Sequence, residues 1–345
     1  MNHLLSHYIC IEPDFFQELK ERIGEISGKL ANFIRTLELV RPSRFMSSEM
    51  KWCRLGRKMH SREKMFCAFL LKAEYNLPTT KLLIESLKSN SSWRLLCGWD
   101  YSTQIPSEAT FSRAFAQFAK VELPDAVHEA IVIEQFHNQL VGHASIDSTE
   151  IKGREKACRK NTPKKKLKQK RGRKSKTEKA ALQKEEAQEQ ELKKRRLEVQ
   201  GNWSLNENLA DLPQGCDKGG KRNSKGDTEW WNGYKLHLGI SDSGIPLGAI
   251  LTSASPHDSQ VAIPMMQMLS ERVTYLYDLC DSAYDAPEIK DYSKAQGHVP
   301  VIDPNRRRGA PKELEPAQKK RYHVRSSVER ATRKSRIITA QIRCG

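Results

Sequence analysis

The hydrophobic pattern of the chain changes its period near residue 141, and this change constrains the fold more than any other feature. Before it, apolar residues recur at spacings of three and four, which is the period of an amphipathic helix. After it, apolar and polar residues alternate in short runs, as in strands with one buried face. The chain has 345 residues, enough for two domains. We therefore expect an all-α domain over residues 1–140 and an α/β domain with a mixed sheet over residues 141–345.

The N-terminal part should consist of several amphipathic helices joined by short connections. The expected helices are Phe15 to Leu39, Lys64 to Tyr75 with Ser61 as N-cap, Thr79 or Thr80 to Leu87, EATFSRAFAQFAK after Ser107, and Pro124 to Leu140. Such a domain suits DNA binding or dimerisation, and a plain helical scaffold is the alternative.

The second part should alternate strands and helices. The expected strands are VGHASID ending at Asp147, the hairpin YKLHLGI and IPLGAILT around residues 241–244, VTYLYDLCD ending at Asp281, and HVPVI. The expected helices are QVAIPMMQMLSERV after Asp258, a helix opened by Asp285 and Pro287 and stopped by Gly297, and a last one beginning near Tyr322. Antiparallel neighbours followed by βαβ units make a mixed sheet.

A strongly basic segment separates the first strand from the hairpin. Residues 154–179 carry fourteen Lys or Arg and only two Glu. Like charges at this density repel and leave too little apolar surface for a core. We expect residues 153–230 to form a basic, flexible insertion that loops out of the α/β domain. Its part KTEKAALQKEEAQEQELKKRRLEVQ mixes charge signs and could be a solvated helix.

The composition points to a polyanionic partner. The formal net charge is +17, and cations released from phosphates favour binding of a basic protein to nucleic acid. A membrane surface is the rival polyanion, but no stretch approaches the roughly 18 apolar residues of a membrane span. The start, MNHLLSHYIC, lacks the pattern of a secretory signal. We expect a cytoplasmic protein that binds nucleic acid and no membrane.

The cysteines do not predict a metal site. Eight are scattered along the chain and none forms a CxxC pair, the spacing that structural zinc sites use. They are expected to be free thiols, several of them small core residues.

Three acidic residues occupy positions that suit phosphodiester chemistry. Asp147 and Asp281 end expected strands, so their carboxylates can converge at one edge of the sheet, and Glu329 lies in the last helix. Carboxylate oxygens suit Mg²⁺, and two such ions can activate the attacking oxygen and stabilise the leaving one. The alternative is that each Asp is only a turn or cap residue.

These residues lie in motifs that resemble a known family. The motifs are SIDSTEIKG, GYKLHLGISDSGIPLGAILTSASPHDS, LYDLCDSAYDAPEI and YHVRSSVERATRKSR. Together they resemble insertion-sequence transposases with a DDE catalytic triad on an RNase H-like fold, from about Ser61 to the end of the chain. The last motif is similar to the Tyr-x2-Arg-x3-Glu-x6-Lys signature of one large branch.

The resemblance implies a bacterial, nucleoid-associated DNA transposase. Asp147 and Asp281 would share two Mg²⁺ ions, which Mn²⁺ could replace, and Glu329 would complete the second metal site. The substrates would be double-stranded DNA, namely terminal inverted repeats and target DNA. The reaction would free 3′-hydroxyls that then attack the target, with a homodimer forming the synaptic complex.

The signature residues Tyr322, Arg325, Glu329 and Arg336 fall on one face of a helix at offsets of three, four and seven. Arg325 and Arg336 could hold flanking phosphates while Glu329 reaches the metals. A surface stripe of salt bridges is the alternative. Arg336 stands where the family has Lys, which changes the phosphate geometry.

Further basic and aromatic residues are candidates for DNA contact. Arg171 and Arg173 could enter a narrow minor groove or bind phosphates without specificity. A basic run precedes Trp230 and Trp231, which could stack on a displaced base or pack in the hairpin; its members are Lys218, Lys221, Arg222 and Lys225. Lys225 and Lys235 are expected to contact DNA.

Three alternatives remain open at this point. His257 and Asp258 could be a metal pair, but helix capping by Asp258 is simpler. The rival functions are a nuclease that cuts without joining strands and an inactive or truncated transposase relic that only binds DNA, since the chain stops sixteen residues after Glu329.

Overall fold

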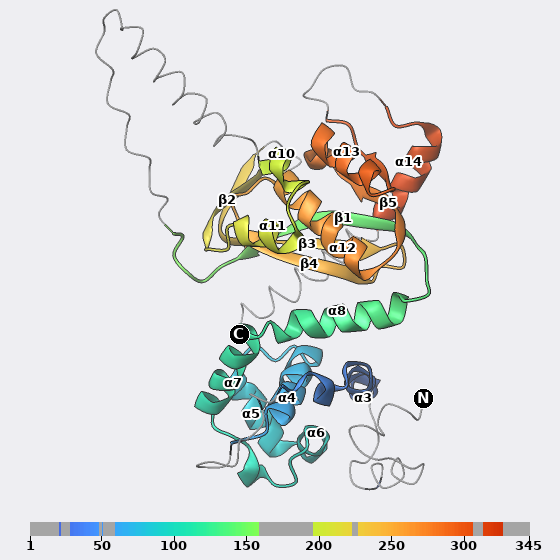
Figure 1. Ribbon diagram of the computed structural model, residues 1–345. Helices are drawn as coiled ribbons and strands as arrows, with labels where there is room; N and C mark the ends of the chain where they lie inside the picture. Colours follow the sequence, from blue (N-terminus) through green and yellow to red (C-terminus); the bar gives the residue numbers. More distant parts are fainter. Residues whose placement is uncertain are drawn as a thin grey trace, which may run out of the picture. The chain divides into compact units, whose positions relative to one another are not determined.

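The computed structural model describes residue 21 and residues 28–47, 50, 59–158, 196–222, 227–305 and 313–326 (Figure 1). The chain divides into two compact units, one ending at Gln135 and the other beginning at Phe136. Each unit has its own arrangement of elements.

The first unit is helical. Its helices are α3 (Gly28–Val40), α4 (Arg62–Glu74), α5 (Thr80–Ser89), α6 (Ser91–Leu96), α7 (Glu108–Lys120) and α8 (Leu123–Phe136), with 3-10 turns η1 (Pro42–Phe45) and η3 (Ser102–Gln104). Ser61 and Thr79 cap α4 and α5, as their sequence positions predicted. The short helix α6 was not expected, because six residues are too few to show a helical period.

Burial follows the expected periodicity in this unit. Phe33, Met65, Leu71, Leu83 and Phe111 are fully buried in one apolar core shared by α3, α4, α5 and α7. The last helix ends at Phe136, four residues before the expected end at Leu140, so residues 137–140 connect it to the first strand.

The second unit is built on a six-stranded mixed sheet. Its strands are β1 (Val141–Lys152), β2 (Asp217–Arg222), β3 (Thr228–Ser241), β4 (Pro246–Ser253), β5 (Tyr275–Cys280) and β6 (Val299–Ile302). Its helices and turns are α10 (Arg196–Gln200), α11 (Leu205–Asp211), η4 (Asp258–Val261), α12 (Ala262–Arg272), η5 (Ser282–Tyr284), α13 (Pro287–Ala295), α14 (Pro316–Tyr322) and η7 (His323–Arg325).

The strand pairing gives the expected mixed sheet. β4, β3 and β1 are antiparallel neighbours, and β5 and β6 then continue the sheet parallel to β1. β2 extends the far end of β3 as an antiparallel hairpin. This order, with helices joining the parallel strands, is consistent with the RNase H-like fold that the sequence predicted.

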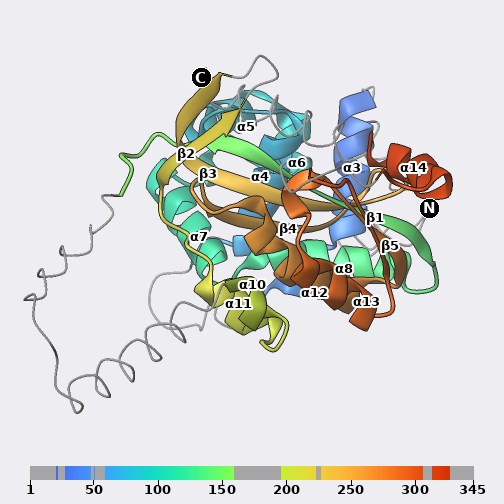
Figure 2. The same ribbon diagram turned by 90° about the horizontal axis from the view of Figure 1, so that it is seen from above.

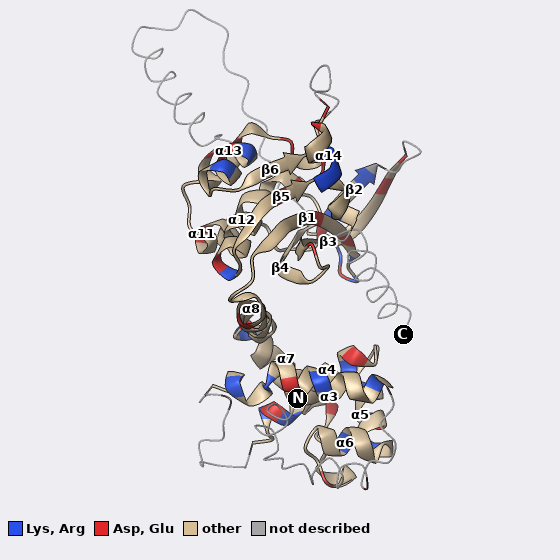
Figure 3. Cartoon of the chain, turned by 90° about the vertical axis from the view of Figure 1, so that its right-hand side faces the viewer, with Lys and Arg blue, Asp and Glu red and all other residues tan. Residues whose placement is uncertain are grey.

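Helices cover both faces of the sheet. Figures 2 and 3 show α11, α12 and α13 on one side and α14 on the other. α12 approaches β3 closely because Gly239 has no side chain, since a Cβ there would stand 2.7 Å from Cδ1 of Leu269. The side of β1 that carries Ile146 therefore faces α12, and the alternating side chains point the other way.

Part of the expected insertion belongs to this fold. Residues 196–222 form α10, α11 and β2, and the side chains of Gln200 and Asn208 are fully buried. Gln200 donates to the Gln260 carbonyl at 2.7 Å and Asn208 donates to Gln267 at 2.8 Å, which fixes both helices to α12 and η4. The expectation that all of 153–230 loops out is wrong for these residues, because polar hydrogen bonds replace the apolar pattern that signals packing. Residues 159–195 lie outside the described part of the chain.

Candidate active site

Asp147 lies inside β1 rather than at its end, which corrects the sequence-based prediction. The parallel pairing of β1 with β5 stops at Ile146 and Cys280, while the antiparallel pairing with β3 continues to Lys152. β1 thus continues for six residues beyond its last pair with β5. The predicted end of the strand was too early, because the alternation of apolar and polar residues continues through STEIK. Asp147 still lies at the point where the pairing of β1 with β5 ends.

Asp281 follows β5 directly, as predicted. Its Oδ1 accepts the backbone N–H of Ala283 at 2.9 Å, so the carboxylate is fixed at the start of the turn η5. Since Ile146 pairs with Cys280, Asp147 and Asp281 come next along two adjacent parallel strands. The topology therefore brings together two carboxylates that are 134 positions apart in the chain.

Arg325 lies between these two aspartates. Its Nη2 is 3.2 Å from Oδ1 of Asp147 and 3.6 Å from Oδ2 of Asp281. Only 12% of the Arg325 side chain is exposed. The guanidinium also lies 5.9 Å from the ring centre of Tyr322. One cation therefore bridges both carboxylates.

Aromatic contacts fix the segment that carries Arg325. Arg321 lies over the ring of Tyr277 at 4.2 Å, and Tyr277 in turn stacks on His143 with ring centres 5.1 Å apart. Arg321 and Arg325 are four residues apart and both face the sheet. Figure 3 shows Lys and Arg residues in blue on α14 and on β2.

The electrostatics of the two aspartates are dominated by burial. Burial raises the pKa of Asp147 above 3.8, the Arg325 charge opposes this, and the Asp281 charge raises it further. Burial also raises the pKa of Asp281, again opposed by Arg325. Lys221 of β2 lowers both values slightly. Arg325 and Lys221 thus do not offset the effect of burial on the two carboxylates, so further positive charge at the site would lower both pKa values.

The opposite face of the sheet holds a different acidic residue. The Nζ of Lys235 donates to Oδ1 of Asp258 at 2.9 Å and to the Pro256 carbonyl at 2.8 Å. Burial acts to raise the pKa of Asp258, but the Lys235 charge and hydrogen bond outweigh it and the pKa is lowered. Lys235, expected to contact DNA, is instead 13% exposed and engaged inside the domain.

His257, rather than Asp258, caps the turn η4. Its Nδ1 accepts the backbone N–H of Ser259 at 3.3 Å, whereas Asp258 pairs with Lys235. The capping role expected for Asp258 is therefore wrong.

The donor set at Asp147 and Asp281 fits a divalent cation. The oxygens of both carboxylates are hard ligands, and a guanidinium already occupies the position between them as a stand-in cation. Among the described residues no group of three or more His, Cys, Asp and Glu side chains is arranged to hold a metal. Glu329 and Arg336, the remaining expected members, lie outside those residues.

The other candidate residues have mixed outcomes. Trp231 is 7% exposed and packs in the hairpin, whereas Trp230 is 64% exposed with Nζ of Lys218 at 5.1 Å from its ring. Tyr322 is half-buried beside Arg325. Arg171, Arg173 and Lys225 fall outside the described residues.

Two residues near the site were not expected there. Lys221, named from the sequence only as part of a basic run, lies in strand β2, and its charge acts on both aspartates. The hydroxyl of Tyr284 is fully buried close behind the aspartates. Strand β2, which carries Lys221, was hard to predict because its sequence DKGGKR shows no alternation of apolar and polar residues. Tyr284 stands in the second-aspartate motif and could have been found from it.

The described residues include no helix long and apolar enough to cross a membrane.

Two family models match the chain. Residues 141–343 match the family described as "Transposase DDE domain", which covers more than half of the chain. Residues 21–117 match "Transposase domain (DUF772)". No curated protein and no solved structure matches significantly.

Proposed function

Because the chain belongs to the DDE transposases of insertion sequences, we propose that it cuts DNA at the ends of a mobile element and joins the freed ends to target DNA. The observation that carries this proposal is the pair Asp147 and Asp281, which share one cation at the edge of an RNase H-like sheet. DNA is the substrate that the family implies, and the net charge of +17 suits it.

The proposed metal ligands are Asp147, Asp281 and Glu329. Two Mg²⁺ ions, or Mn²⁺ in their place, would supply an activated water and neutralise charge on the departing 3′ oxygen. Glu329 follows Arg325 by four residues, so a continuing helix would direct it to the same face. The Ala283 N–H orients Asp281, and the long pairing of β1 with β3 orients Asp147.

We further propose that Arg325 changes partners when cations bind. The same position cannot favour both a guanidinium and divalent ions, because like charges repel at this distance. Released from the aspartates, Arg325 would contact a DNA phosphate beside the scissile bond, together with Tyr322 and Arg336. Trp230 and the cation of Lys218 form an exposed pair that could support a displaced base.

We also propose that two copies act together on double-stranded DNA, because both terminal inverted repeats of an element have to be held at once. Each copy would cut one end, and the 3′-hydroxyls would then attack the target DNA.

The test uses DNA that brackets this reading frame. With Mg²⁺, the wild-type chain is expected to cut at inverted repeats and to join 3′-OH donor ends to a plasmid. Asp281→Ala should lower both rates by at least about a thousandfold, since the site loses a metal ligand. Cutting without joining would indicate a nuclease. Binding without cutting at any Mg²⁺ or Mn²⁺ concentration would contradict the proposal and indicate a DNA-binding relic.

A further inference from the structure

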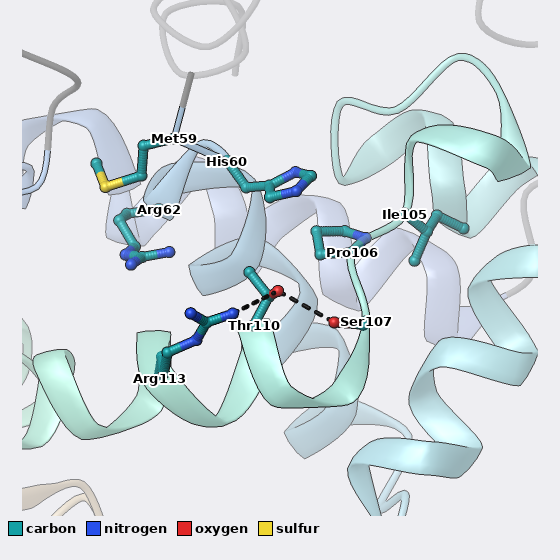
Figure 4. Close-up of a pocket in the computed structure, with 8 residues that line it drawn as sticks. All are labelled: Met59, His60, Arg62, Ile105, Pro106, Ser107, Thr110 and Arg113. Carbon is teal, nitrogen blue, oxygen red and sulfur yellow. Dashed lines mark hydrogen bonds between the residues drawn. The ribbon is translucent and has the colours of Figure 1, made fainter. Parts of the chain in front are cut away.

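The helical N-terminal unit contains a cavity that is not part of the candidate active site. Its volume is about 520 Å³, within the size range of ligand pockets. It opens where α4 and α7 begin (Figure 4). The lining residues are Met59, His60, Arg62, Ile105, Pro106, Ser107, Thr110 and Arg113. Three of them are basic or can become cationic, and none is acidic.

Two arginines give the cavity its charge. The Nε of Arg62 donates to Oε1 of Gln117 at 2.7 Å, and the Nε of Arg113 donates to the Ala109 carbonyl at 3.2 Å. The Nη2 of Arg113 also approaches the Thr110 hydroxyl at 3.4 Å. Figure 4 shows both guanidinium groups turned toward the same space. Each is thus held along one edge, which fixes its position in the wall.

The two charges repel each other. Burial, and then the charge of Arg113, lowers the pKa of Arg62. Among the described residues no carboxylate forms an ion pair with either guanidinium. Because no acidic side chain among the described residues offsets these two charges, the cavity carries a positive charge that an anion would offset.

The surrounding backbone adds to the positive potential. α4 and α7 each have 13 residues, and both begin at the cavity. The N-terminus of a helix carries a partial positive charge and exposed N–H groups. Ser107, the N-cap of α7, makes no side-chain cap hydrogen bond, and its hydroxyl contacts that of Thr110 at 3.2 Å. These hydroxyls could donate to an anion.

We propose that this cavity binds a phosphate group of the DNA backbone, with Arg62 and Arg113 as its ligands. The proposal rests on the proposed function, because it takes a DNA-acting protein as its premise. Guanidinium groups suit phosphate because two parallel N–H groups match two of its oxygens. The excess of basic residues over the chain favours DNA over an acidic peptide.

The test compares Arg113→Gln with Lys120→Gln, measuring affinity for a duplex DNA over a range of salt concentrations. Both variants lose one positive charge from an exposed position on α7, but Lys120 does not line the cavity. Arg113→Gln should bind about tenfold more weakly, with a slope of log affinity against log salt that is smaller by about one. Lys120→Gln should change the affinity by less than about twofold. Equal losses in both variants, or no loss in Arg113→Gln, would overturn the proposal.

A second variant separates binding from folding. Thr110→Glu places a carboxylate in the cavity, so it should weaken DNA binding while the melting temperature holds or rises. Inorganic phosphate should raise the melting temperature of the wild type but not that of Arg113→Gln. Tight DNA binding by Thr110→Glu, or equal stabilisation of both proteins by phosphate, would contradict a phosphate site.

All binding is measured without divalent metal, so the result is independent of cleavage. If Arg113→Gln weakens binding although the wild type never cuts DNA, the cavity proposal stands and the catalytic one fails. If the wild type cuts DNA and Arg113→Gln binds normally, only the cavity proposal fails.

Discussion

The two faces of the catalytic sheet each hold acidic groups beside a buried cation, with opposite electrostatic results. On the face of the sheet that α12 covers, Asp258 forms an ion pair with Lys235, and the pKa of Asp258 is lowered. On the face of α14, Asp147 and Asp281 share Arg325, and the pKa of each is raised. Among the described residues, Lys235 outweighs the effect of burial on Asp258, whereas the cations near Asp147 and Asp281 do not outweigh the effect of burial on them.

This difference separates structural acids from candidate catalytic ones. The ion pair of Lys235 with Asp258 stabilises the fold and does not favour binding of a further cation. Buried carboxylates whose burial is not offset cost stability in the isolated protein, and a bound cation would compensate them. The contrast predicts opposite effects for the same substitution at the two places.

The largest expected effect is on stability at Asp258. Asp258→Asn leaves the buried ammonium of Lys235 without its counter-ion, and the free energy of unfolding should fall by about 3 kcal/mol. Urea denaturation measures this change. The double variant Asp258→Leu with Lys235→Met should recover much of the loss, because it removes both charges together.

Asp281→Asn is the matched control for that prediction. It removes the same charge from a carboxylate that burial already disfavours, so stability should hold or rise at neutral pH. A loss as large as that of Asp258→Asn would show that the two faces do not differ in the way described.

The next effect concerns pH. His237 is fully buried near Asp258, and burial lowers its pKa from 6.5 to about 4. The unfolded chain therefore binds a proton more readily between these values, and stability is lost as pH falls from 6.5 toward 4. The loss amounts to about 3 kcal/mol, at roughly 1.4 kcal/mol per unit.

His237→Asn keeps a polar group for the hydroxyl of Thr252, which lies 3.1 Å from Nε2 of His237. The difference in unfolding free energy between wild type and variant should shrink or reverse as pH falls through this window. A constant difference from pH 7 to 4 would show that His237 does not titrate in this way.

The smallest expected effect is on cation affinity at Arg325. Arg325→Gln removes a positive charge from between the aspartates, so Mn²⁺ should bind about tenfold more tightly without DNA, a change of about 1.4 kcal/mol. Electron paramagnetic resonance of free Mn²⁺ measures it. Arg321→Gln, four residues earlier on the same segment and over Tyr277, should change the affinity by less than about twofold. Equal affinities for wild type and Arg325→Gln would remove the basis for an exchange of partners.

Much of the fold could be predicted from the sequence, because hydrophobic periodicity and helix-capping residues indicate the local secondary structure. The hairpin of β3 and β4, the strand before Asp281 and the capped helices of the N-terminal unit all carry such signals. The match to the transposase DDE domain family confirmed the RNase H-like assignment that the motifs predicted. Helix α11 and strand β2 were not predicted, and α10 was expected only as the end of a solvated helix. Gln200 and Asn208 pack through hydrogen bonds that no hydrophobic pattern reveals.

The candidate site could be predicted only in part. The positions of Asp147 and Asp281 followed from strand alternation, although β1 runs beyond Asp147. The last helix, expected to begin near Tyr322, instead runs over α14 and ends at Tyr322, and Arg325 lies in the 3-10 turn η7 that follows. The contact of Arg325 with both aspartates depends on how this segment packs, and spacing along one helix does not determine that. Lys235 seemed available for DNA because its partner Asp258 is 23 residues away in sequence.

The central claim is that Asp147 and Asp281 jointly hold divalent cations. A crystal of the protein in Mn²⁺, measured near the manganese absorption edge, tests it most directly. We predict an anomalous peak in contact with both carboxylates, Glu329 within reach of it, and the Arg325 side chain moved away. Manganese absent from the two aspartates at saturating concentration, with Arg325 still between them, would contradict the account.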